Sequence, residues 1–559
     1  MNRKRIYIFL LLLLAVLFTV RNKKLFNYEL VERGTEGGEF TSGWFSLISK
    51  EINKKKVKLI VDGRTVDTGR QQVLMDETGD FMIPVSLLTD AFSCAAHIYD
   101  DSRLVIEKNT VRAELHLDEE QGLSMIDETL YVSAKAIETA LSYTWEWNVE
   151  ERKLEMTSMN AELEMLPAAY DYREVGRAPR VKNQGTLGTC WSFASLMALE
   201  SRLLPEELYD FSEDHMSRRN SFHMDQNDGG EYTMSMAYLL AWQGPVLESE
   251  DAYGDNFSPA GLSPSKHVQG IEVLPSKDYQ AIKEAVYFYG GVQSSLYTSM
   301  VTGQKESGYY NKAKGAYCYL GTARPNHDVV IIGWDDNYSK DNFSVVPEGD
   351  GAFICANSWG GEFGEEGYFY VSYYDANIGI HNILYKRVDE TDNYDRNYQT
   401  DLCGWVGQLG YGREDAYFAN VYQTKTTEEL MAVGFYATGA DTSYEVYVSS
   451  DLENINFLNR TLVAKGTFKN SGFYTVDFDT PIRLQEGQRF AVIVNITTPG
   501  SVHPVAIEYN APDKQAKVDL TDGEGYISLL GTTWERVEEK QNCNVCLKAY
   551  TREVKKSGE

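Results

Sequence analysis

The sequence has little cysteine: seven residues are scattered from Cys94 to Cys546 in a chain of 559. Domains that are held together by a disulfide framework carry cysteine at a much higher density, so this chain does not belong to that class. Only Cys543 and Cys546 lie close together, with the spacing of metal ligands but with no second pair nearby. We therefore expect a small disulfide or two free thiols there, and no metal.

Positive charge is scarce too. The 53 lysine and arginine residues are outnumbered by 82 aspartate and glutamate residues, which gives a formal net charge of −29. A surface of this sign repels the phosphates of nucleic acids and the headgroups of anionic lipids, so we expect no nucleic-acid partner. The excess negative charge favours solubility, and it attracts cationic peptides during encounter.

The apolar run at the N-terminus is short. Arg3 and Arg5 precede an uncharged stretch of about fifteen residues, Ile6 to Val20, which has the length of a signal peptide and is short for a membrane span. No small-x-small cleavage site follows, so we expect residues 1–24 to remain as a signal anchor in the membrane, with a cleaved signal peptide and a secreted protein as the alternative. Both place the rest of the chain outside the cytoplasm. Residues 25–56 are polar and predict a linker.

The segment Asn183 to Phe193 reads Asn-Gln-Gly-Thr-Leu-Gly-Thr-Cys-Trp-Ser-Phe and places Cys190 after a glycine turn. Apolar residues then recur at helical spacing until Pro205, so Cys190 is expected at the first residue of a helix. Cysteine attacks as a thiolate, and the partial positive charge of a helix N-terminus stabilises that anion. Gln184, six positions earlier, has an amide that can donate a hydrogen bond to a developing oxyanion.

A histidine and an asparagine that suit this cysteine follow much later. His327 opens an apolar run that predicts a buried strand, and Asn357 follows a second apolar run. Histidine takes the thiol proton to form an ion pair, while the asparagine amide fixes the orientation and tautomer of the ring. Trp359 is close enough in sequence to cover that contact and keep water away. The set predicts a cysteine peptidase.

These motifs resemble the papain family of cysteine peptidases. In that family His and Asn follow the cysteine by about 130–150 residues; here the separations are about 137 and about 167 residues, and a polar insertion from Asp335 to Asp350 accounts for the excess. The resemblance extends from about Pro167 to about Arg387, and we expect the peptidase domain at residues 165–388. It is also supported by matching pieces in the same order: Asp171–Arg173, Phe211–Glu213, Asp228–Gly230 and Gly290–Ser294.

The resemblance implies roles for further residues. Gln184 and the backbone N–H of Cys190 would hold the oxyanion, and Gly229 and Gly230 would pair with an extended substrate backbone. Trp359 would border the substrate as well as cover the histidine. The pocket for the side chain two residues before the cut would draw on three residues: Tyr232, Ser294 and Asn326.

Two positions depart from the family pattern. Leu187 stands where many members carry a disulfide cysteine, so that bridge is missing here. Asp328 follows the histidine where a small apolar residue is usual. A carboxylate at this place raises the pKa of His327 if it faces inward and has no effect if it faces solvent.

The sequence on either side of the peptidase predicts two other domains. Residues 57–158 hold a faint internal repeat, in which a strand, a short helix and two strands recur after roughly 47–49 positions. It resembles the copper amine oxidase N-terminal repeat module, but His97 and His116 are isolated, so neither copper nor another cofactor is expected. The helical inhibitory propeptide of papain-like zymogens is not evident.

Residues 398–552 follow a charged linker and alternate polar with apolar residues, which predicts an antiparallel β-sandwich. This part resembles the lectin-like domain that follows the peptidase in some clostridial surface enzymes. Trp405 and Trp534 have the chemistry to stack on sugars, although a place in the core is the expectation for both.

We therefore expect an α+β multidomain protein: a small repeat module, a papain-like domain with a helical half and a β-barrel half, and a lectin-like β-sandwich. Its expected function is that of an exported endopeptidase acting on proteins or peptides at the cell surface, because the paired histidines of an exopeptidase loop are missing. Two alternatives stay open. One is a surface adhesin that binds wall or host glycans and has a vestigial peptidase domain; the other is a transpeptidase that passes the acyl group to an amine.

Overall fold

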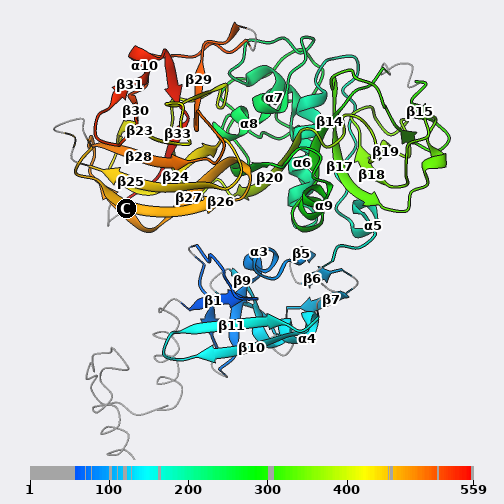
Figure 1. The fold of residues 1–559 in the computed structure, drawn as a ribbon, viewed down its shortest axis with the longest axis horizontal. Coiled ribbons are helices and arrows are strands. Elements are labelled where there is room, and N and C mark those ends of the chain that lie inside the picture. The colour runs from blue at the N-terminus through cyan, green and yellow to red at the C-terminus, as the bar shows by residue number, and fades with distance from the viewer. Residues whose placement is uncertain are drawn as a thin grey trace, which may run out of the picture. The chain divides into compact units, whose positions relative to one another are not determined.

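The computed structural model describes residues 57–555, except for short gaps at 70, 77–78, 100–102, 110, 118–121, 127–128, 161–164, 300–306, 451, 453–456 and 513–514. The expected signal segment and linker lie outside the described residues. The rest combines helices with extensive sheets (Figure 1), which confirms the predicted α+β class. In the described part, no helix is long and apolar enough to cross a membrane.

The N-terminal part of the described chain is built from two similar halves. Each half runs strand, helix, strand, strand, and the first strands of the two halves pair antiparallel, with Met82 opposite Ser133. The halves consist of β4 (Phe81–Pro84), α3 (Leu88–Phe92), β5 (Ala95–Tyr99) and β6 (Arg103–Lys108), then β9 (Thr129–Ser133), α4 (Ala134–Leu141), β10 (Tyr143–Asn148) and β11 (Lys153–Ser158). Strand β1 (Lys58–Val61), which precedes both halves in the chain, pairs parallel with β11, the last strand of the second half. The kinship of this module with a named repeat family stays a prediction.

The helical half of the next domain is arranged around α6 (Cys190–Leu203), in which 12 of 14 residues are buried. A helix that is buried nearly all round needs apolar or small residues on every face, and the run from Trp191 to Leu203 supplies them. It ends where Leu204 turns extended ahead of Pro205. The other helices here are α5 (Tyr172–Val175), α7 (Glu213–Arg219), α8 (Tyr232–Leu240) and α9 (Tyr279–Phe288).

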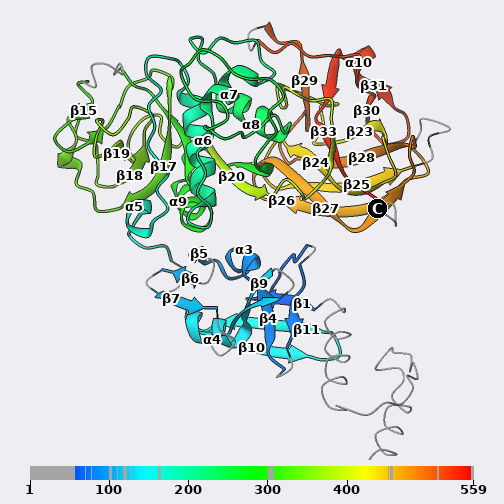
Figure 2. The ribbon, with the colours of Figure 1, turned by 180° about the vertical axis from the view of Figure 1, so that it is seen from behind.

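The second half is a sheet in which β17 (His327–Asp335) is central. Its first eight residues are all buried, because α6 packs on it and strands flank it on both sides. Figures 1 and 2 show α6 running alongside β17 and β14 (Val292–Leu296). The strand order is β18, β17, β14, β20, β13, formed by β18 (Ala352–Ala356), β20 (Asn382–Asp389) and β13 (His267–Val273), with β19 (Tyr368–Ser372) outside β18.

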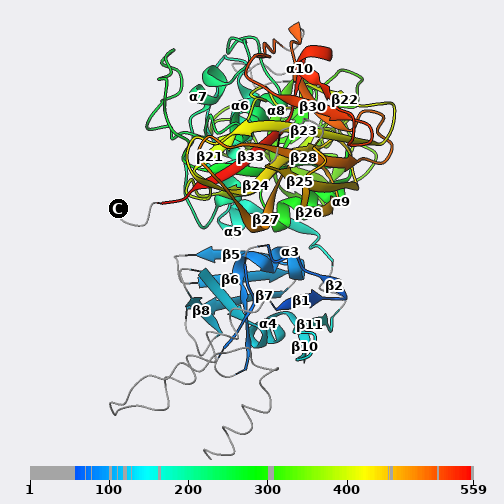
Figure 3. The ribbon, with the colours of Figure 1, turned by 90° about the vertical axis from the view of Figure 1, so that its left-hand side faces the viewer.

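The C-terminal part is an antiparallel β-sandwich, as predicted (Figure 3). One sheet contains β26 (Thr461–Phe468), β25 (Thr442–Ser449), β28 (Arg489–Thr497), β23 (Asp415–Gln423), β30 (Gly525–Ser528) and β31 (Glu535–Arg536). The facing strands are β27 (Ser471–Leu484), β24 (Glu428–Ala437), β33 (Leu547–Glu553) and β21 (Arg396–Tyr398). The layer between them is apolar and includes Val433, Phe435, Val446, Val494 and Leu547.

The sandwich and the preceding domain share one sheet. Strand β13 pairs with β20 on one side and with β27 on the other, with Gly270 opposite Tyr474. The two tryptophans considered as sugar platforms both pack on aromatic neighbours. Trp405 lies 5.8 Å from the Tyr436 ring and Trp534 lies 4.9 Å from the Phe457 ring, and both are half-buried.

Candidate active site

Cys190 is the first residue of α6, and the turn before it is held from outside the helix. The N-cap residue, Thr189, forms no side-chain bond to the helix amides; its hydroxyl lies 2.7 Å from that of Tyr253. The N–H groups of Ser192 and Phe193 donate to the carbonyl of Thr189, whereas those of Cys190 and Trp191 interact with the sulfur. The backbone amides of Cys190, Trp191 and Asp328 all lower the pKa of the thiol.

His327 and Asn357 form a direct contact. Nε2 of His327 lies 2.8 Å from Oδ1 of Asn357, and that same oxygen accepts the backbone N–H of Ser358 at 2.8 Å. The bond from the backbone N–H identifies this atom as the amide oxygen, which has no hydrogen to donate, so Nε2 of His327 carries the proton. Nδ1 is then the basic nitrogen, which is the atom left to take a proton from a thiol. Trp359 covers the pair, with its ring 4.8 Å from the imidazole.

Gln184 is tied to the same loop as Asn357. Its backbone N–H donates to the carbonyl of Ser358 at 2.8 Å, and its Oε1 accepts the Ser358 hydroxyl at 2.6 Å. Its Nε2 donates to the Leu187 carbonyl at 2.8 Å, which uses one of the two amide hydrogens. The amide is thus locked in orientation and keeps a second hydrogen for another acceptor.

Burial dominates the titration of the two reacting groups. Burial, followed by the Asp328 carboxylate, raises the pKa of Cys190 to about 12. Burial lowers the pKa of His327 to about 4, although the bond to Asn357 raises it. Both shifts favour the neutral thiol and the neutral ring. An ion pair between the two would therefore require proton transfer inside the site, with the attraction of the two charges and the helix amides offsetting the desolvation.

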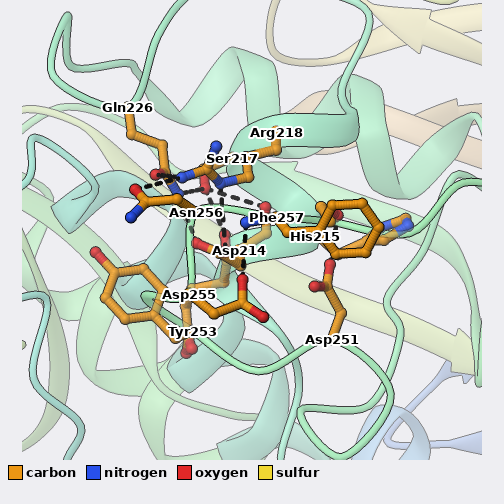
Figure 4. Close-up of polar contacts among 12 residues, drawn as sticks. Asp214, His215, Ser217, Arg218, Gln226, Asp251, Tyr253, Asp255, Asn256 and Phe257 are labelled. Carbon is orange, nitrogen blue, oxygen red and sulfur yellow. Dashed lines mark hydrogen bonds and ion pairs between the residues drawn. The ribbon is translucent and has the colours of Figure 1, made fainter.

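A polar network supports the loops around Cys190 (Figure 4). Asp214, which is fully buried, accepts from Nε2 of Gln226 at 2.6 Å and pairs with Arg218 at 3.3 Å. The backbone carbonyl of Gln226 in turn accepts the N–H of Gly188, two residues before the cysteine, at 2.9 Å. On the other side, the Tyr253 hydroxyl donates to the carbonyl of Gln184 at 2.9 Å.

The glycine strip lies next to the nucleophile. A Cβ on Gly230 would lie 2.3 Å from Nε1 of Trp191, and Gly229 has a left-handed φ of 86° and closely approaches Gly188. Only glycine allows this approach, so the strip lies against the start of α6. Tyr232, the first residue of α8, follows at once, with its ring 5.5 Å from that of His381.

The other two residues expected in the pocket lie elsewhere. Ser294 donates to Asn382 at 3.2 Å and accepts the N–H of Gly379, so it faces β20. Asn326 is exposed and clamps Thr298 through two backbone hydrogen bonds. No described hydrogen bond joins either side chain to Tyr232, and on β14 it is Ser295, the neighbour of Ser294, that contacts Asp328.

Asp328 is the polar residue that faces this region instead. Its carboxylate accepts from the Ser295 hydroxyl at 2.7 Å and from the Gln293 amide at 2.9 Å. It affects the pKa of Cys190 and not that of His327, because it points away from the imidazole. Because neighbouring residues of a strand face opposite sides, the sequence could have shown that the side chains of Asp328 and His327 point in opposite directions. Nothing in the sequence pointed to Tyr253 or Ser358.

Of the seven cysteines, Cys190 is half-buried and the other six are buried, and all carry free thiols. Cys543 and Cys546 are among the buried ones. No cluster of histidine, cysteine, aspartate or glutamate with the geometry of a metal site occurs within the described ranges.

Comparison with known proteins assigns both main domains. Residues 166–387 match the papain family cysteine protease model, and residues 397–551 match the lectin like domain model. One similar solved structure is the crystal structure of the cysteine protease and lectin-like domains of Cwp84, a surface layer associated protein of Clostridium difficile. Its sequence is 28% identical to this chain and its TM-score is 0.60. The match covers 69% of this chain and 89% of that structure. A structure of Cwp84 after propeptide cleavage has a TM-score of 0.62 at 28% sequence identity. The match covers 69% of this chain and 99% of that structure.

Curated relatives also match part of this chain. A viral cathepsin of Choristoneura fumiferana defective polyhedrosis virus is 26% identical over 237 residues, which is 41% of this chain and 67% of the relative. Cathepsin K of Gallus gallus is 30% identical over 215 residues, which is 36% of this chain. The chain spans 58% of the length of that relative.

Proposed function

The chain carries a papain-family cysteine peptidase domain followed by a lectin-like domain, and we propose that it cleaves peptide bonds within protein chains at the cell surface. The observation that carries the mechanism is the 2.8 Å contact between Nε2 of His327 and Asn357, which leaves Nδ1 as the base. The proposed catalytic residues are Cys190, His327, Asn357 and Gln184.

The proposed reaction has two stages. The Cys190 sulfur attacks the scissile carbonyl carbon while its proton moves to Nδ1 of His327. The oxyanion accepts from the Cys190 N–H and from the second amide hydrogen of Gln184. His327 then protonates the leaving nitrogen, the C–N bond breaks, and a thioester remains. Water, which gives a proton to His327, hydrolyses the thioester and restores the thiol.

Three features support export and a surface location. Residues 1–24 have the composition of a signal segment, the relative Cwp84 is itself described as surface layer associated, and a lectin-like domain is suited to glycans. We propose the division 1–24 signal anchor, 25–56 linker, 57–158 repeat module, 165–388 peptidase and 398–552 lectin-like domain. The lectin-like domain would hold the enzyme on wall or host glycans while the peptidase works on nearby proteins.

Cleavage of a long peptide blocked at both ends tests this proposal. An endopeptidase cuts such a peptide internally, whereas an exopeptidase needs a free end. We expect internal cuts by the full ectodomain and none by Cys190→Ala. Tight binding to wall polymer without any cleavage would favour the adhesin, and transfer products with an added amine nucleophile would favour the transpeptidase.

A further inference from the structure

Asp328 is a buried carboxylate beside Cys190 that forms no ion pair with a described side chain. It follows His327 on β17 and faces the opposite side of the strand, with 9% of its surface exposed. Burial raises the pKa of Asp328, and the charge of the nearby His381 lowers it, but no described lysine, arginine or histidine forms an ion pair with its carboxylate. Buried charges in proteins are nearly always paired, so a carboxylate that forms no ion pair requires an explanation.

Burial raises the pKa of Asp328, whereas two hydrogen bonds favour its charged form. Ser295 donates to Oδ1 at 2.7 Å, and Nε2 of Gln293 donates to Oδ2 at 2.9 Å. The amide of Gln293 cannot turn round, because its Oε1 already accepts the hydroxyls of Ser195 at 2.9 Å and Tyr385 at 3.0 Å. A chain of buried donors from α6 and β20 therefore ends on this carboxylate, and both of its oxygens are fixed in place.

Asp328 is also close to where a substrate would lie. Its backbone N–H interacts with the Cys190 sulfur, and after burial its carboxylate raises the pKa of Cys190. Burial, Glu231 and then Asp328 raise the pKa of Tyr232, the second residue after Gly230. Three further titratable groups face it: Glu231 before α8, His381 before β20, and Tyr385 on β20. A side chain that leaves an extended backbone at Gly230 thus meets the Tyr232 ring and the Asp328 carboxylate.

We propose that Asp328 is a specificity-determining residue that selects arginine or lysine two residues before the cut. The substrate cation forms the ion pair that Asp328 lacks, and its aliphatic stem packs on the Tyr232 ring. The net charge of −29 attracts such substrates before they bind. This inference rests on the peptidase function proposed above and names its substrate class.

Two blocked fluorogenic peptides test the inference. They differ only in carrying arginine or its neutral isostere citrulline two residues before the scissile bond. We expect the full ectodomain to prefer arginine by roughly 30-fold or more in kcat/KM, since losing one member of a desolvated charge pair is costly. Asp328→Asn should bring the two rates close together and still cut the citrulline peptide. The control Glu348→Gln, at an exposed position in the insertion between β17 and β18, should keep the preference.

A pH series on the wild-type protein gives a second measurement that needs no variant. Burial raises the pKa of Asp328, so the carboxylate gains its proton above the usual range as the pH falls. The arginine preference should be full at neutral pH and be lost on acidification through that pKa. The titration of Cys190 and His327 affects both peptides equally and cancels in the ratio.

Alkylation of Cys190 by a small epoxide without a side chain at this position separates the two proposals. Equal rates on both peptides, or an unchanged preference in an Asp328→Asn variant whose Cys190 still reacts, would overturn the specificity and leave the peptidase standing. A wild-type protein that neither reacts with the epoxide nor cuts any peptide would overturn both.

Discussion

At the scale of single residues, the site depends on a few side chains whose orientation is fixed twice. Asn357 accepts from both His327 and the backbone of Ser358, and Gln184 is bonded through both ends of its amide. Such double fixing means that no reorganisation is needed when charge develops during the reaction. It also lets individual roles be separated by substitution.

Gln184→Ala should lower kcat by about 10²–10³-fold, because it removes a donor to the oxyanion. KM should change little, since the ground-state carbonyl needs this donor less than the transition state does. Ser358→Ala is the matched control: it breaks the bond to Oε1 but leaves the donating hydrogens. Steady-state kinetics on one blocked peptide distinguish the two. An equal loss in both variants would show that Gln184 acts by holding the loop.

Gly230→Ala should lower kcat/KM by on the order of 10²-fold, because the new methyl group meets the Trp191 indole and shifts the strip beside Cys190. Gly361→Ala serves as the control, since no atom lies within 4 Å of its added Cβ. Steady-state measurement of kcat/KM for both variants tests this prediction. Full activity in Gly230→Ala would mean that the strip does not position the substrate.

At the scale of elements, α6 is fixed to the loop before it through a buried lysine. Nζ of Lys182 lies 3.1 Å from Glu200 on α6 and 3.0 Å from Glu213 on α7, and both carboxylates are almost fully buried. It also donates to the carbonyl of Phe211 at 2.7 Å. This single ammonium therefore joins two helices to the segment that leads into Gln184.

Lys182→Met should destabilise the fold by about 3–5 kcal/mol, because it leaves two buried carboxylates without a cation. Arg180→Met, which removes an exposed pair with Asp210, should cost about 0–1 kcal/mol. Urea unfolding monitored by tryptophan fluorescence compares the two. Equal stability of both variants would contradict a supporting role for Lys182.

The strands show what sequence reasoning reaches and where it stops. The helix at Cys190 and the strand at His327 could be predicted, because apolar spacing and Pro205 are local signals. Ser294 was expected in the pocket, whereas its neighbour Ser295 faces Asp328, since a shift of one residue reverses the side of a strand. The sequence showed where the strands lie, but not which of their residues face the pocket.

At the scale of the whole molecule, the peptidase and the sandwich are joined by more than a linker. Strand β13 pairs with β27, Thr475 donates to Gln269 at 2.7 Å, and Arg387 pairs with Asp477 at 2.7 Å. The sequence predicted two successive domains but not their shared sheet. Pairing between strands about 200 residues apart leaves no local pattern to read.

This shared sheet predicts that the peptidase and the sandwich unfold together. Calorimetry of the full ectodomain should show one transition for both, because separating them exposes the edges of β13 and β27. Arg387→Ala, which removes the contact to Asp477, should lower that transition without splitting it. Two well-separated transitions for residues 165–388 and 398–552 would contradict this prediction.

The central claim is that Cys190 is the activated nucleophile of the chain. The most direct measurement is reaction of the full ectodomain with an epoxide inhibitor of cysteine peptidases, followed by mass mapping of all seven cysteines. We expect one adduct, on Cys190, which is lost in Cys190→Ala and forms much more slowly in Asn357→Ala, while the six buried cysteines stay unmodified. An unreacted Cys190, or labelling that does not depend on Asn357, would contradict it.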